Sequence, residues 1–153
     1  MPIRQTGVKA QRGVALIEVL IAFLILSVGL VGFSALQVRA VKATQSSLQR
    51  NDAAMLANSV LESMRANRAA ATAYTLPYNI SKTCATPGAN TTLADTDLAA
   101  WFVNLKSALG DVDSTCADIT CTTGAMCTVN VYWDDSRALG GIATQSLQMV
   151  SRL

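Results

Sequence analysis

Four cysteines in the C-terminal half of the chain are the residues whose type and number most directly suggest covalent chemistry. None of them forms the C-x2-C pair that is typical of a zinc site. In an exported domain this even set predicts two disulfide bonds, whereas in the cytosol the same residues would be free structural thiols. The cysteines are Cys84, Cys116, Cys121 and Cys127.

Glu18 is the second residue that could do chemistry, because it is the only charged residue between Val14 and Leu36. A carboxylate inside a membrane span costs about 2.5–3.5 kcal/mol on insertion scales, so such a residue is a functional candidate by default. Its position near one end of the apolar run lowers that cost, since the side chain can reach the interface.

The composition excludes several classes of function. The 153 residues include no histidine, which excludes histidine metal ligands and Ser-His-Asp or Cys-His catalysis. Charged residues make up only 14% of the chain and hydrophobic residues 51%, so the chain is too apolar to be disordered. Residues 71–153 carry seven aspartates against four basic residues, which argues against a nucleic-acid partner.

An uncharged run of 20 residues, from Val19 to Val38, predicts a membrane-spanning helix, because a hydrocarbon core of ~30 Å needs about 20 helical residues. Arg4, Lys9 and Arg12 precede the run, so the positive-inside rule keeps this leader in the cytoplasm. In a bacterium the rest of the chain then lies in the periplasm, where disulfides form. A cleaved signal peptide has a shorter apolar run, and a plain signal anchor leaves Glu18 unexplained.

The junction GVALIE, residues 13–18, resembles the processing signature of type IV pilins and type II secretion pseudopilins. In that family a prepilin peptidase cuts a short basic leader after a glycine, methylates the new N-terminus, and leaves a glutamate as the fifth mature residue. The resemblance implies cleavage between Gly13 and Val14 and N-methylation of Val14. It also implies that Glu18 pairs with the N-terminus of a neighbouring subunit and so guides assembly.

Two departures from the common pilin pattern argue against a major, filament-forming subunit. The first mature residue would be Val14 where phenylalanine is usual. Ala35 stands where major pilins usually carry a proline, so no proline kinks the helix there.

Residues 37–70 contain no proline or glycine and are rich in helix formers, which predicts that the helix continues beyond the membrane. Apolar residues recur along it at intervals of seven and then four, which predicts an amphipathic stripe packed on the C-terminal domain. These residues are Val41, Leu48 and Met55, followed by Leu56, Val60 and Met64.

The segment LESMRANRAA near the end of this helix is similar to minor pilins of the PilV type, also called type IV pilus modification proteins, as are the later GDVD and CTVNVYWDD. This resemblance implies a tip or priming complex that initiates pilus assembly, supports adhesion and twitching motility, and ends at the cell surface. The implied partners are the prepilin peptidase, other minor pilins, the major pilin, a tip adhesin and, before assembly, the inner membrane.

The globular half is expected to contain a loop over residues 71–88 and a helix over residues 97–109, capped by Asp95 or Thr96 and ended by Gly110. Alternating patterns predict three short antiparallel strands over residues 111–116, 127–133 and 145–153. Because two cysteines end facing strand segments, the pairing Cys116–Cys127 with Cys84–Cys121 is favoured among the three that are available.

The predicted fold is therefore α+β and type IV pilin-like, with a long N-terminal helix packed on a small sheet of about three strands. Its segments are a leader (1–13), a membrane and filament-core helix (14–36), an amphipathic continuation (37–70) and a disulfide-containing head (71–153).

The head shows no pattern of catalytic or metal-binding residues. Asp111 and Asp113 weakly resemble a calcium loop, but Cys116 and Thr122 stand where glycine and glutamate belong, so a solvated turn is expected. We therefore expect neither an enzyme nor a cofactor or metal. The alternatives are a type II secretion pseudopilin, a DNA-uptake pilin and an enzyme anchored by a signal helix.

Overall fold

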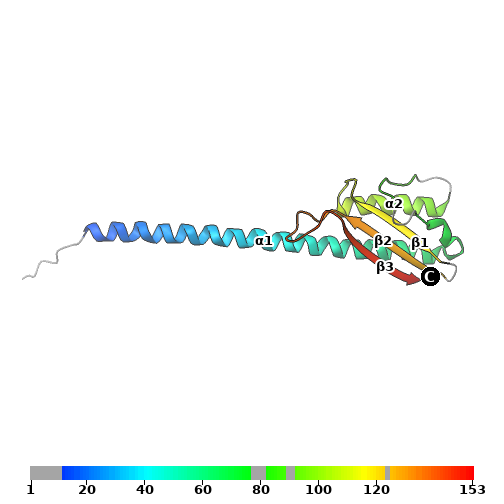
Figure 1. Ribbon diagram of the computed structural model, residues 1–153, viewed down its shortest axis with the longest axis horizontal. Helices are drawn as coiled ribbons and strands as arrows, with labels where there is room; N and C mark the ends of the chain where they lie inside the picture. The colour runs from blue at the N-terminus through cyan, green and yellow to red at the C-terminus, as the bar shows by residue number, and fades with distance from the viewer. Residues whose placement is uncertain (1–11, 77–81, 89–91, 123–124) are drawn as a thin grey trace, which may run out of the picture. The chain divides into compact units, whose positions relative to one another are not determined.

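The computed structural model describes residues 12–76, 82–88, 92–122 and 125–153 of the chain (Figure 1). The chain divides into two compact units, residues 1–40 and 41–153. The first unit is helical throughout its described part. The second contains helices and one small sheet, which confirms the predicted α+β, type IV pilin-like fold. The finer division at residues 36 and 70 stays a prediction.

Helix α1 spans Arg12–Ala66 and ends four residues earlier than the sequence suggested. A 3-10 helix, η1, follows over Arg68–Tyr74. Asn67 between them has a non-helical backbone, although its N–H still donates to the carbonyl of Ser63 at 3.0 Å. The chain turns here, and Tyr74 at the end of η1 is fully buried in the core of the second unit.

The buried face of α1 within the second unit differs in part from the predicted stripe. Val60 and Met64 are buried as expected, and Leu56 is partly buried against the core. The row formed by Val41, Leu48 and Met55 was expected to pack on the head, but these side chains are 56–68% exposed.

Two alanines, and not the row of Val41, Leu48 and Met55, belong to the face of α1 that packs against the rest of the head. Ala53 and Ala57 are completely buried. At about 100° per residue, Met55 lies about 200° around the helix from each of them, and so on the opposite face. The alanines let other elements approach the helix closely, and the Trp101 indole N–H donates to the Leu56 carbonyl at 2.8 Å.

Helix α2 spans Leu93–Leu109 and begins four residues before the predicted start. Thr92 is its N-cap, and the side chain of Asp95 completes a capping box instead of capping the helix itself. The end at Leu109 before Gly110 is confirmed, as is the burial of the apolar residues at helical spacing. These residues are Leu98, Trp101, Phe102 and Leu105.

The sheet has three antiparallel strands in the order β1-β2-β3. Strand β1 spans Cys116–Cys121, β2 spans Met126–Trp133 and β3 spans Gln145–Arg152. The last two agree with the prediction. The first strand was placed too early, because residues 111–114 form a turn and a bend that precede β1.

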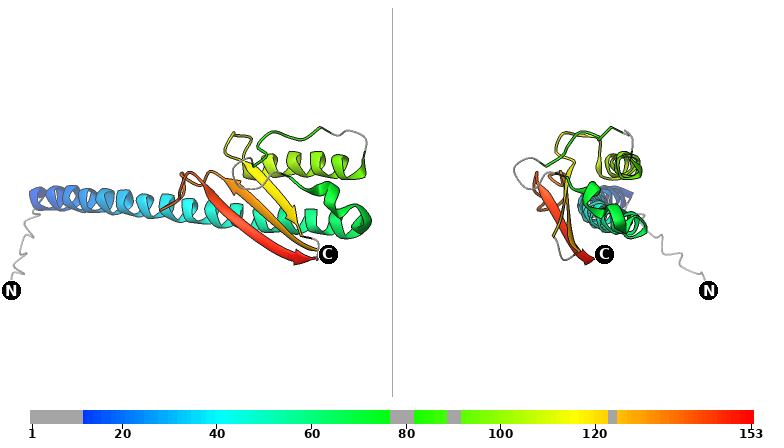
Figure 2. Two further views of the ribbon diagram at one scale, coloured as in Figure 1. Left: turned by 45° about the vertical axis from the view of Figure 1, so that its right-hand side comes forward. Right: turned by 90° about the vertical axis from the view of Figure 1, so that its right-hand side faces the viewer.

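The core of the second unit lies among α1, α2 and the inner face of the sheet, and Figure 2 shows α2 and the sheet against the same stretch of α1. Alternate residues of β2 are all fully buried on that inner face, as the alternation predicted. They are Cys127, Val129, Val131 and Trp133.

Candidate functional site

The first unit presents its apolar side chains outward. The large hydrophobic residues from Leu16 to Val38 are each 52–72% exposed. Among the described residues, one helix is long and apolar enough to cross a membrane, and its most apolar window is entirely unburied within the chain. A surface of this kind is stable in lipid or against other apolar helices.

Glu18 is an exposed side chain on this apolar surface. No hydrogen bond or ion pair joins it to another residue in the described part of the chain. The two serines of the run differ from it, because their hydroxyls donate to carbonyls of their own helix. Ser27 donates to Leu24 at 2.8 Å and Ser34 donates to Leu30 at 2.9 Å. The serine hydroxyls thus find acceptors within their own helix, whereas Glu18 has no such partner in the described part of the chain.

The predicted cleavage position lies at the beginning of the described chain. Gly13 and Val14 have helical backbone in the first turn of α1. Arg4 and Lys9 of the basic leader lie outside the described residues. Farther along, an added Cβ at Gly29 or Gly32 meets nothing within 4 Å, so these glycines leave flat positions on the helix surface where another helix can approach closely.

The disulfides join Cys84 to Cys116 and Cys121 to Cys127, so the favoured pairing of Cys116 with Cys127 and Cys84 with Cys121 is wrong. The register gives the reason. Cys121 lies opposite Cys127 at one end of the β1–β2 ladder, whereas Cys116 lies opposite Tyr132 at the other end. At about 3.3 Å per residue, Cys116 is about 17 Å along β1 from Cys121. All four cysteines are bonded, as predicted.

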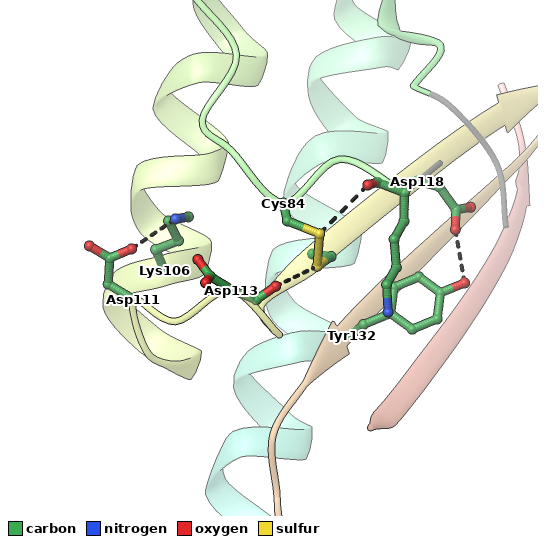
Figure 3. The surroundings of a disulfide bond; sticks show 8 residues. Cys84, Lys106, Asp111, Asp113, Asp118 and Tyr132 are labelled. Atoms are coloured by element: carbon green, nitrogen blue, oxygen red, sulfur yellow. Dashed lines mark hydrogen bonds and ion pairs between the residues drawn. A yellow bond between two sulfur atoms is a disulfide. The ribbon is translucent and has the colours of Figure 1, made fainter. Parts of the chain in front are cut away.

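A short segment beside β1 brings Cys84 to its partner. Thr83 pairs antiparallel with Ala117, which places Cys84 beside Cys116 and Lys82 beside Asp118. Figure 3 shows this disulfide next to Asp118 and Tyr132. The Lys82 ammonium lies 4.5 Å from the centre of the Tyr132 ring, within the range of a cation–π interaction.

Asp118 is a fully buried carboxylate on the outer face of β1. Its oxygens accept hydrogen bonds from the Asn130 amide at 2.6 Å and from the Tyr132 hydroxyl at 2.8 Å. The sequence did not identify this cluster, because neither the strand nor its register could be fixed from the pattern. The only signal was an aspartate enclosed by strand-forming residues, in CADIT.

Asp135, in the turn after β2, is a second buried carboxylate. It is 3% exposed and accepts a hydrogen bond from the Ser46 hydroxyl at 2.6 Å. Asp135 and Ser46 line a groove of about 460 Å³ between α1, the end of α2 and the turn after β2. Lys42 and Arg137 also line this groove. By contrast, Asp111 in the predicted solvated turn is exposed and pairs with Lys106 at 2.8 Å.

Two groups in the head have shifted pKa values. Burial, followed by the hydrogen bond to Asp97, raises the pKa of the Tyr74 hydroxyl, and the Asn67 amide opposes this shift. The backbone N–H of Ser136 donates to Asp134 at 2.8 Å and lowers the pKa of that exposed carboxyl. Within the described residues, no group of three or more cysteine or acidic side chains could hold a metal ion.

Comparison with known proteins gives two family matches. The model of the Tt1218-like family, described as type IV pilin Tt1218, matches residues 35–132, which is more than half of the chain. The model of the prokaryotic N-terminal methylation motif matches residues 8–34, a range that includes Gly13, Val14 and Glu18. No curated protein and no solved structure matches the chain.

Proposed function

The chain belongs to the Tt1218-like family of type IV pilins, which are structural proteins, and from this membership we propose that it is a minor pilin of a type IV pilus. In this proposal, prepilin peptidase cuts between Gly13 and Val14 and methylates the new amine of Val14. The head is then held in the periplasm by the apolar helix until the subunit enters the tip or priming complex of the pilus. The PilV-type segment near the end of α1 supports the minor role.

The observation that carries this proposal is Glu18 standing alone on an exposed apolar helix, four residues after the proposed new N-terminus. Four residues correspond to about 6 Å along the helix. A cationic amine and a carboxylate attract strongly where water is excluded. Glu18 of one subunit can therefore hold the amine of its neighbour while the surrounding apolar side chains pack as a helix bundle. Ala35 stands where major pilins usually carry a proline, and Val14 stands where phenylalanine is usual. Both differences favour a minor subunit over a major one.

Processing is tested by intact-mass and N-terminal peptide mass spectrometry of protein from its own host. The expected chain begins at Val14 and carries one N-methyl group. A chain that begins near Ala35 or Val41 would mean cleavage by signal peptidase, and the pilin mechanism would be abandoned for this protein.

The role of Glu18 is tested by three variants in a strain that lacks the wild-type copy. Glu18→Ala and Glu18→Gln should leave membrane insertion and cleavage intact but lower the amount of this subunit in sheared pili and the number of pili. The glutamine variant separates charge from shape. Ser27→Ala is the matched control, because its hydroxyl bonds only within its own helix. Normal incorporation of both Glu18 variants would mean that the carboxylate is only tolerated at the interface.

Two other assignments make different predictions. A type II secretion pseudopilin would leave pilus number unchanged and impair protein secretion when deleted. A DNA-uptake pilin would bind DNA with a strong dependence on salt. The acidic head does not support the second assignment, since residues 71–153 hold seven aspartates and four basic residues.

A further inference from the structure

The two edges of the head's sheet differ in how their backbone groups are bonded. At the β1 edge, the Leu76 N–H donates to the Ile119 carbonyl at 2.9 Å. Thr83 and Ala117 exchange two hydrogen bonds, of 2.9 and 2.8 Å. The Cys84–Cys116 disulfide holds this covering segment in place. The β1 edge is therefore closed to a further strand.

The β3 edge is open. All eight residues of β3 pair with β2 in continuous register, without a bulge. The Leu153 N–H donates to the Ala125 carbonyl at 2.9 Å, so the odd-numbered residues of β3 bond to β2 and the even-numbered ones face away. Within the described residues, no other backbone segment bonds to these outward positions, although the Ser151 hydroxyl donates to the Arg152 carbonyl at 3.4 Å. The outward positions are Ser146, Gln148, Val150 and Arg152. Figure 2 shows β3 along the outer side of the sheet.

The side chains of β3 do not protect this edge. Proteins commonly block an exposed edge with lysine, proline, a bulge or an inward-pointing charge. Strand β3 contains none of these, and its single charge is Arg152 at the end. Leu147 and Met149 on the inner face are only partly buried against the core. A fourth strand would complete the cover over this apolar pair.

We propose that the β3 edge is an interaction surface that accepts an extended strand from another protein subunit. The outward N–H and C=O groups would bond to the added strand. Leu147 and Met149 call for apolar side chains at alternate positions of that strand. This surface lies in the head and does not depend on the N-terminal helix or on its processing.

Arg152, at one end of the β3 edge, adds a requirement on the charge of the added strand. Arg152 forms no ion pair with any residue in the described part of the chain. The neighbouring Arg65 donates to the Ser151 hydroxyl and pairs with Glu62. The added strand should therefore carry an aspartate or glutamate beside Arg152. A second copy of β3 does not fit this requirement, because QSLQMVSR contains no acidic residue.

The test uses the full-length protein in its own host, with a photo-crosslinking amino acid in place of Ser146. Irradiation should attach a peptide of another protein that alternates apolar and polar residues and carries an acid near Arg152. Gln148→Pro in the same protein removes one outward N–H without breaking a bond to β2. The loss of that hydrogen bond should lower the cross-link yield about tenfold. Gln148→Thr keeps the N–H and should retain the yield.

A second pair of variants keeps the test decisive if Gln148→Pro does not fold. Val150→Lys places a charge on the edge and should also abolish the cross-link. Val103→Lys is its matched control, because Val103 is a similarly exposed valine on α2. Equal yields from Val150→Lys and Val103→Lys would overturn the proposal. So would the absence of any cross-link, or a cross-link only to β3 of a second copy.

Discussion

Cys121 lies directly opposite Cys127 at the end of the β1–β2 ladder, and a disulfide joins the two residues across the strands. This bond closes a loop with a sequence separation of only 6. The Cys84–Cys116 bond has a separation of 32 and fixes the segment that covers the β1 edge. One disulfide thus reinforces a hairpin, while the other attaches a distant part of the chain to the sheet.

Removing the long-range disulfide should destabilise the head more than removing the short one. The chain-entropy relation gives about 3.7 kcal/mol for the Cys84–Cys116 loop and about 2.2 kcal/mol for the hairpin bond. Thermal unfolding of Cys84→Ala/Cys116→Ala and Cys121→Ala/Cys127→Ala, measured on full-length protein in detergent, checks the order. Peptide mapping without reduction checks the pairing itself. A larger loss from the hairpin pair would show that the covering segment contributes little.

Gly141 should not tolerate a side chain. An added Cβ would lie 1.8 Å from the carbonyl oxygen of Asp135. Gly141→Ala should therefore displace the turn and destabilise the head by several kcal/mol. Gly140→Ala is the comparison, because its Cβ meets nothing within 4 Å and its cost comes from a φ of +76° alone, about 1 kcal/mol. Equal losses from the two variants would contradict the contact with Asp135.

The Tyr132 hydroxyl should stabilise the head through Asp118. Tyr132→Phe keeps the ring under Lys82 and removes only the donor to the buried carboxylate. A hydrogen bond to a charged group contributes about 1.5–3 kcal/mol, so the free energy of unfolding should fall by that amount. Asp118→Ala should cost more, because it also leaves the Asn130 amide without its acceptor. A Tyr132→Phe variant as stable as wild type would mean that water replaces the hydroxyl.

Tyr74 should make the head less stable in alkali. Burial and Asp97 raise its pKa in the folded chain above the ordinary value of about 10. The unfolded chain therefore loses its proton first, and the free energy of unfolding should fall as the pH rises above about 10. Below that pH the group adds no pH dependence. Tyr74→Phe should flatten this decline in denaturant titrations at successive pH values, and an unchanged slope would assign the decline to other groups.

Much of the architecture was determined by local sequence pattern. The uncharged run from Val19 to Val38, the alternation of β2 and β3, and the end of α2 at Gly110 each follow from residues close together in the chain. Leu98, Trp101 and Phe102 could be assigned to the core for the same reason, since helical spacing alone places them on one face. The resemblance of residues 13–18 to the prepilin signature is equally local, and the family matches agree with it.

Only the tertiary structure showed the features that depend on how segments far apart in the sequence pack and pair with one another. The sequence could not show that Thr83 pairs with Ala117, and that pairing brings Cys84 to Cys116. It could not show that α1 turns Ala53 and Ala57 towards the core and leaves Val41, Leu48 and Met55 exposed. Apolar periodicity shows which residues of a helix lie on the same face. The shape of the elements that pack against the helix selects which face is buried, and small alanines allow the closest approach. The burial of Asp118 follows for the same reason, since its donors lie on another strand.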